Sequence, residues 1–160
     1  RVSLAHLYFT SDDRPHAERM LETYENFFMD ITPGCEMYYA FLADREGWTR
    51  FFEKWQDKIV FGTDMEDDMQ DIVFGSQEVI NGLVTSTLIG NAYFESAGAK
   101  GTGLGLKAEV LRKIFAENFE KRAGKTPKAI SESGLSDYVS WLMPKLTKED
   151  RMRAEALLKG

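Results

Sequence analysis

Short apolar segments alternate with longer amphipathic ones over the first 62 residues of the chain. The apolar segments cover about 2–8, 27–31 and 58–62, and their residues favour β-strands. Between them, apolar residues recur at spacings of three and four, as they do on one face of a helix. The pattern predicts strand, helix, strand, helix, strand. Strands joined through helices pair in parallel, so an α/β fold is expected.

The predicted helices have recognisable faces and ends. The first begins near Pro15, which the first turn of a helix tolerates because its missing N–H has no partner there. One or two further helices occupy about 35–57. They carry four large aromatic residues on one predicted buried face, namely Trp48, Phe51, Phe52 and Trp55.

Beyond the third apolar segment the pattern becomes mainly helical. Residues 67–95 predict helix interrupted by glycines, and 97–105 predict a glycine-rich flexible loop. Residues 106–124 form a clear amphipathic helix with a glycine at its end. The tail, about 126–160, is also expected to be helical, with Thr147 as an N-cap.

Composition narrows the class of protein. The length of 160 residues suits one domain. Hydrophobic residues make up 43% of the chain and charged residues 29%, a composition that allows a packed core. The net charge of −6 argues against binding to nucleic acid or to an anionic membrane. Cys35 is the single cysteine, which fits a reducing, cytoplasmic compartment. Because the chain starts at Arg1 and runs directly into a predicted strand, we expect it to be part of a longer protein.

Three candidate residues lie at the ends of the predicted strands. His6 is near the end of the first strand, Asp30 ends the second, and Asp64 follows the third. Parallel strands bring their carboxyl ends to one edge, where α/β proteins gather reactive groups. An imidazole and a carboxylate together can bind a divalent metal or activate water.

Each candidate also has a structural interpretation. Asp64 could be the N-cap of a helix, and His6 could be a hydrogen-bonded core residue. Asp30 is expected to be structural and His16 to lie at the surface. The acids that follow Asp64 suit the first turn of a helix, where the helix dipole favours negative charge; they are Glu66, Asp67, Asp68 and Asp71.

Three stretches resemble the C-terminal part of a metal-dependent hydrolase of the amidohydrolase superfamily, in the amidohydrolase-2 branch that includes decarboxylases. "VSLAHL" resembles the sixth barrel strand, which ends in a histidine, and "KIVFGTDM" resembles the eighth strand. "GLGLKAEVLRKIFAENFEKRAG" resembles the closing helix, whose Leu-x-x-Ile-x-x-x-Asn pattern is matched by Leu111, Ile114 and Asn118. The resemblance covers about residues 1–124.

The resemblance implies a TIM-type (β/α)₈ barrel, of which this chain would supply about three parallel strands, with 125–160 as a helical extension. It implies that Asp64 and His6 are catalytic and contribute to a metal site, with Asp64 handling a proton of the attacking water. The metal would be divalent, with Zn²⁺ the best match. The expected reaction is hydrolysis of a C–N or C–O bond of a small-molecule substrate, or a related nonoxidative decarboxylation.

The chain also departs from the family. It has no His-x-His pair, its two histidines are His6 and His16, and a complete barrel takes about 250 residues. We therefore expect the isolated chain to be inactive. Its expected partner is the missing N-terminal barrel half, or a second copy through exposed strand edges. The alternative is a non-catalytic α/β interaction domain in which Asp64 caps a helix and His6 lies in the core.

Overall fold

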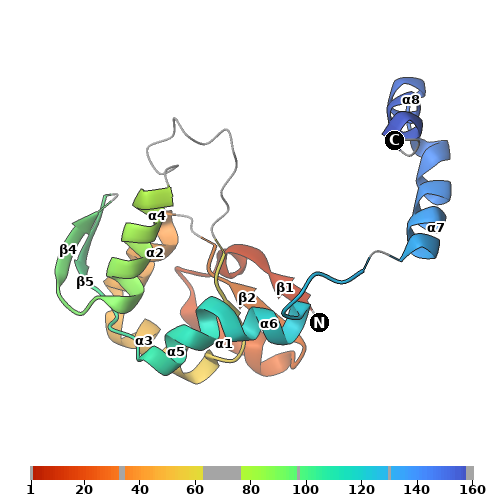
Figure 1. Cartoon of the computed structure of the whole chain (residues 1–160). Helices are drawn as coiled ribbons and strands as arrows, with labels where there is room; N and C mark the ends of the chain where they lie inside the picture. The colour runs from red at the N-terminus through yellow and green to blue at the C-terminus, as the bar shows by residue number, and fades with distance from the viewer. Residues whose placement is uncertain (1, 33–34, 63–76, 97, 130, 158–160) are drawn as a thin grey trace. The chain divides into compact units, whose positions relative to one another are not determined.

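The computed structural model describes residues 2–32, 35–62, 77–96, 98–129 and 131–157 of the chain. The chain divides into two compact units, the α/β unit of residues 1–123 and the helical unit of residues 124–160. The elements of the α/β unit in chain order (Figure 1) are β1 (Val2–Leu4), η1 (Ala5–Phe9), α1 (Arg14–Thr23), β2 (Phe27–Asp30), α2 (Cys35–Ala43), α3 (Arg45–Trp55), β3 (Ile59–Val60), α4 (Gln77–Val84), η3 (Thr85–Ile89), β4 (Tyr93–Ser96), β5 (Ala99–Thr102), α5 (Ala108–Arg112), η4 (Lys113–Glu117) and α6 (Asn118–Ala123).

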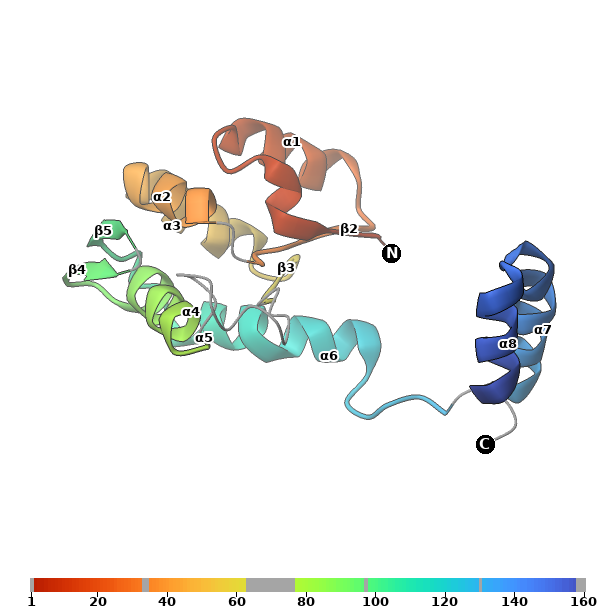
Figure 2. The same cartoon turned by 90° about the horizontal axis from the view of Figure 1, so that it is seen from above.

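A small parallel sheet forms the centre of the α/β unit. Its order is β1-β2-β3, and Met29 of β2 lies opposite Leu4 of β1 and Ile59 of β3. The helices α1, α2 and α3 lie on one side of these strands, and α5 and α6 lie on the other (Figure 2). The prediction of three parallel strands joined by helices is confirmed, so the unit is mixed α/β. That the strands are a segment of a barrel stays a prediction.

The first strand is shorter than the sequence predicts. The expected strand over 2–8 ends at Leu4, and the backbone then enters the left-handed region from His6 to Phe9. A left-handed backbone cannot continue the extended ladder of a sheet, so pairing with β2 stops there. Strand propensity alone favoured the longer strand, because Leu7, Tyr8 and Phe9 are all good strand residues.

An aromatic core fills one side of the sheet. Phe41 of α2 is fully buried and packs edge to face on Phe52, with ring centroids 5.2 Å apart. The predicted face of α3 is confirmed: Trp48, Phe51 and Phe52 are buried, and Trp55 packs against them partly exposed. Asp44 caps this helix by accepting a hydrogen bond from the N–H of Gly47.

The helical run of η4 and α6, which we call the closing helix, covers the outer edge of β3. The carbonyls of Lys58 and Val60 accept from β2, so the polar groups of Ile59 and Phe61 point to the other edge. Phe61 N–H donates to the carbonyl of Ile114 in η4 at 3.0 Å. Asn118 Nδ2 donates to the carbonyl of Ile59 at 2.7 Å. Two of the groups that could pair with a further strand beside β3, the Phe61 N–H and the Ile59 carbonyl, are therefore bonded to the helix.

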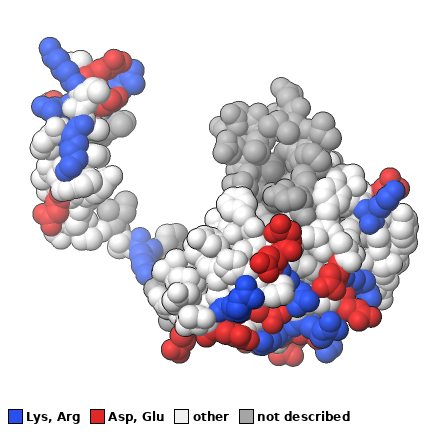
Figure 3. Space-filling model, turned by 180° about the vertical axis from the view of Figure 1, so that it is seen from behind, with Lys and Arg blue, Asp and Glu red and all other residues white. Residues whose placement is uncertain are grey.

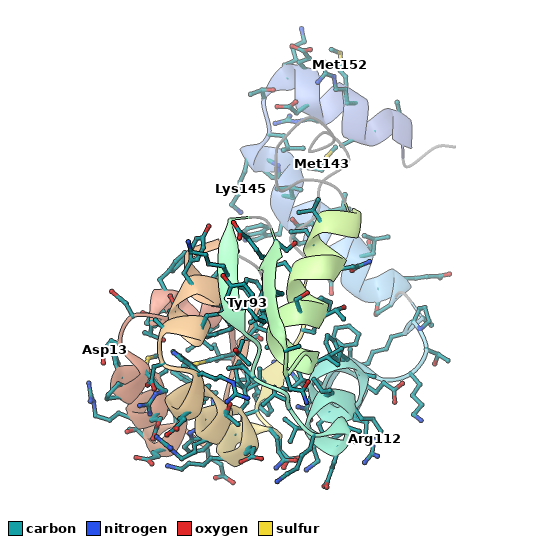
Figure 4. All side chains as sticks on the ribbon, turned by 90° about the vertical axis from the view of Figure 1, so that its left-hand side faces the viewer. Asp13, Tyr93, Arg112, Met143, Lys145 and Met152 are labelled. Carbon is teal, nitrogen blue, oxygen red and sulfur yellow. The ribbon has the colours of Figure 1, made fainter. Side chains whose placement is uncertain are left out.

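The segment between β3 and α5 differs most from the prediction. The helix expected over 67–95 includes the described helical elements α4 and η3, but 93–96 is strand β4, paired antiparallel with β5. The loop expected over 97–105 is also wrong: part of it is β5, and the chain that follows is packed. Leu104 and Leu106 are buried, and their N–H groups donate to carbonyls of η3. Tyr93 marks the exposed start of β4 (Figure 4).

The helical unit contains α7 (Glu132–Leu142), η5 (Met143–Lys145) and α8 (Lys148–Leu157). Gly124 precedes them with φ of 93°, a left-handed value that suits the residue after a helix. Thr147 begins α8 as predicted, since its Oγ1 accepts from the N–H of Asp150 at 3.2 Å. No described side chain of this unit is buried.

Two surface findings bear on partners. None of the helices in the described ranges has both the length and the apolar composition that a membrane crossing requires. On the face drawn in Figure 3, Lys and Arg side chains are interspersed with Asp and Glu over the α/β unit. Mixed charges of this kind give no extended positive field for nucleic acid on that face.

Candidate functional site

The carboxyl ends of the three parallel strands meet at one edge of the sheet. Asp30 is the last residue of β2, and His6 follows β1 by two residues. The backbone N–H of His6 donates to Asp30 Oδ1 at 2.9 Å. The parallel pairing thus brings these two candidates together, as the sequence predicts for strand ends.

One carboxylate oxygen of Asp30 binds the surrounding backbone and a neighbouring side chain. Its Oδ1 accepts from His6 N–H, from Thr32 N–H at 3.2 Å and from Thr32 Oγ1 at 2.6 Å. Three hydrogen bonds engage the lone pairs of Oδ1 in holding the backbone. Asp30 therefore holds the strand ends in place, which agrees with the expected structural role.

The turn that carries His6 is strained. Four consecutive residues other than glycine have φ between 52° and 56°, namely His6, Leu7, Tyr8 and Phe9. Each such residue costs about 1–2 kcal/mol relative to the right-handed region. Leu7 is fully buried, and its carbonyl accepts from Thr10 Oγ1 at 2.6 Å, so packing and hydrogen bonds hold the turn. Strain of this kind clusters at functional sites.

The His6 side chain is half-buried at this edge. Its ring stacks on Phe9, with centroids 5.3 Å apart and planes at 27°. The Phe9 ring is 73% exposed, so the stacked pair borders solvent. The imidazole is held by the strained turn without being enclosed in the core.

The end of β3 approaches Thr32 closely. A Cβ on Gly62 would lie 2.5 Å from Thr32 Oγ1, so a side chain at this position would displace the hydroxyl that bonds Asp30. Gly62 and Thr32 also line a cavity of about 420 Å³ between the sheet and α6. The other lining residues are Ser3, Asp30, Val60, Phe61, Phe119, Arg122 and Ala123.

Asp64 lies outside the described residues, as do Glu66, Asp67, Asp68 and Asp71. Whether Asp64 converges with His6 or caps a helix therefore stays a prediction. Within the described ranges, no group of three or more His, Cys, Asp or Glu side chains could hold a metal ion. Of the two predicted metal ligands, His6 is the one that the structure describes.

Two residues with clear roles were not predicted from their chemistry. Thr32 links Asp30 to the end of β3, and its signal in the sequence is a polar residue directly after a strand and before Pro33. Asn118 is 1% exposed, and its Nδ2 bonds the carbonyls of both Gln56 and Ile59. Asn118 is the asparagine of the Leu-x-x-Ile-x-x-x-Asn pattern. The two hydrogen bonds from its side-chain amide explain why an amide suits this position.

No protein-family model, curated protein or solved structure matches this chain. The amidohydrolase resemblance therefore rests on the quoted motifs alone.

Proposed function

We propose that this chain is the C-terminal part of a metal-dependent hydrolase of the amidohydrolase type, with its site at the carboxyl edge of β1, β2 and β3. The reaction would be hydrolysis of a C–N or C–O bond of a small molecule, or a related nonoxidative decarboxylation. The observation that carries this proposal is the Asp30-anchored left-handed turn, which holds His6 at that edge.

Two physical arguments support this assignment. Reactive groups of parallel α/β folds gather at the carboxyl ends of strands, and His6 occupies such a position. The strain of four left-handed residues opposes folding and persists only where surrounding contacts enforce it. A turn that merely reversed the chain would be less strained with glycine or asparagine.

The described residues do not make a metal site by themselves. They offer the imidazole of His6, while Asp30 Oδ1 is already engaged by three donors. A bound Zn²⁺ would need Asp64 and further ligands from outside the described ranges, so we derive no catalytic step through it. For the same reason we propose that the isolated chain is inactive and works with a missing N-terminal barrel half.

A second candidate is a non-catalytic α/β interaction domain, and the edge of β3 favours it. In a closed barrel the last strand pairs with the first, yet Phe61 N–H and the Ile59 carbonyl bond the closing helix. A sheet whose edge is already closed in this way can be complete with three strands.

The metal content of the intact gene product, purified without chelators, separates the two candidates. The hydrolase proposal expects about one divalent ion per chain, lost in His6→Ala and in Asp64→Asn. His16→Ala is the matched control, because His16 is exposed at the start of α1. The interaction domain would be favoured if the wild type held no metal. It would also be favoured if His6→Ala and His16→Ala retained the same amount of metal.

A further inference from the structure

The Thr32 hydroxyl holds the carboxylate to which the His6 turn is bonded. Thr32 Oγ1 donates to Asp30 Oδ1 at 2.6 Å, the shortest of the three hydrogen bonds that this oxygen accepts. A hydroxyl that donates to a carboxylate at this distance makes a charge-assisted bond, which is about twice as strong as a neutral one. The hydroxyl is therefore the donor that fixes the orientation of the Asp30 carboxylate most firmly.

Gly62, at the end of β3, leaves the space in which this hydroxyl lies. A Cβ on Gly62 would come 2.5 Å from Thr32 Oγ1, whereas Thr32 Cβ would lie at 3.6 Å, an ordinary van der Waals contact. Gly62 is not among the glycines with positive φ, so the backbone itself would accept alanine. Threonine is stiff about χ1, so an added methyl group can displace the hydroxyl only by forcing it out of its rotamer. The hydroxyl alone thus requires glycine here.

A continuous series of contacts therefore runs from the end of β3 to His6. Gly62 borders the Thr32 hydroxyl, and the hydroxyl bonds Asp30 at the end of β2. The same Asp30 oxygen accepts from His6 N–H, two residues after β1. The His6 ring stacks on Phe9 of the same turn. The position of the imidazole consequently depends on how firmly the carboxylate is held.

We propose that Gly62 and Thr32 are positioning residues for His6 and act on it through Asp30. Glycine permits the hydroxyl, the hydroxyl orients the carboxylate, and the carboxylate holds the left-handed turn that carries the imidazole. The use of that imidazole as a metal ligand rests on the proposed function, whereas the coupling rests on the contacts alone.

Amide hydrogen exchange in the full chain tests the coupling. Gly62→Ala should speed exchange of the His6 amide about tenfold, because a hydrogen bond to a charged group is weakened. It should also change the chemical shifts of the His6 ring protons, which the stacked Phe9 ring influences. Gly82→Ala is the matched control, since the nearest described atom to a Cβ there is Ser96 Oγ at 4.0 Å. This control should leave both readouts unchanged.

Variants of Thr32 isolate the contribution of the hydroxyl. Thr32→Ser keeps the donor, so the His6 amide should exchange as in the wild type, whereas Thr32→Ala should match Gly62→Ala. Gly62→Ala should have no further effect in the Thr32→Ala background, because the atom that it displaces is absent. Effects that multiply in the double variant would overturn the proposal. So would a His6 amide that keeps its wild-type rate in Gly62→Ala.

The metal content of the intact gene product connects the coupling to the proposed function. Gly62→Ala and Thr32→Ala should both lower the bound divalent metal, and Gly82→Ala should not. If the wild type holds no metal, the hydrolase proposal fails, while the exchange rates still decide the coupling. Loss of metal in His6→Ala with full retention in Gly62→Ala would overturn the positioning role.

Discussion

The two units of this chain form helices by the same local rules, but among the described residues only the α/β unit has a buried core. In the α/β unit, Asp13 and Asp44 cap helices whose apolar faces are buried, with Leu21 in α1 and Trp48 in α3 as examples. In the helical unit, Ser131 and Thr147 cap helices in the same way, yet Trp141 remains 58% exposed. Capping and periodicity therefore decide where a helix begins, while stability depends on whether its apolar face is covered.

The largest expected effect separates a buried ring from an exposed one. Phe41→Ala should lower the free energy of unfolding of the α/β unit by about 3–5 kcal/mol, because Phe41 is fully buried against Trp48 and Phe52. Trp141→Ala should change it by less than about 0.5 kcal/mol. Urea titration followed by circular dichroism measures both. Similar losses in the two variants would show that the units share one core.

Asn118 tests whether the closing helix is fixed to the sheet. Asn118→Ala removes the donors to two carbonyls, those of Gln56 and Ile59, and should cost about 2–3 kcal/mol. Asn91→Ala is the control, since Asn91 is exposed after η3. Amide hydrogen exchange should show faster exchange at Phe61 in the Asn118 variant. Unchanged protection would contradict the assigned closure of the β3 edge.

The strained turn predicts a stabilising substitution. Tyr8 has φ of 56° and is 49% exposed, so Tyr8→Gly should raise the free energy of unfolding by about 1 kcal/mol. Tyr24 is similarly exposed at 47%, but its φ is −117°, so Tyr24→Gly should destabilise the unit. Thermal unfolding midpoints would reveal opposite signs. A loss in both variants would mean that the left-handed turn is not strained.

Exposed ion pairs are a feature that the two units share, and the smallest effect is expected there. Lys54 lies 2.7 Å from Glu22 in the α/β unit, and Arg153 lies 2.7 Å from Glu149 in the helical unit. The hydrogen bond to Glu22 raises the pKa of Lys54. Any stability that the Lys54–Glu22 pair contributes is therefore present below the ordinary lysine pKa. It is lost as the pH rises through the raised pKa of Lys54. Lys54→Met should shift the urea midpoint negligibly at pH 7, and a clear shift would contradict this reasoning.

Much of the α/β unit could be predicted from the sequence. The helix over Arg14–Thr23 and the aromatic face of α3 follow from spacing and caps, and the parallel order follows from the alternation of strands and helices. The hairpin β4–β5 could not be predicted in this way. Its strands have four residues each, and its two-residue connection is Ala-Gly rather than the Asn-Gly or Asp-Gly that signals a hairpin, so the helical periodicity nearby dominated.

The candidate site was predictable only in outline. Strand ends located His6 and Asp30, because parallel pairing fixes where they meet. The left-handed turn was not predictable, since its four residues include no glycine, asparagine or aspartate that would favour positive φ. Tertiary contacts impose this turn, through the buried Leu7 and the bonds to Asp30 and Thr10.

The most direct test of the central claim uses the two histidines of one chain as reporter and control. Zinc is added to the uniformly ¹⁵N-labelled intact gene product, which would supply the remaining ligands, while the imidazole nitrogens of His6 and His16 are followed by NMR. The account predicts that zinc shifts a ring nitrogen of His6 while leaving His16 unchanged, and that Asp64→Asn reduces this shift. If His6 does not respond, or if both histidines respond alike, the carboxyl edge of this sheet is not the metal site of a hydrolase.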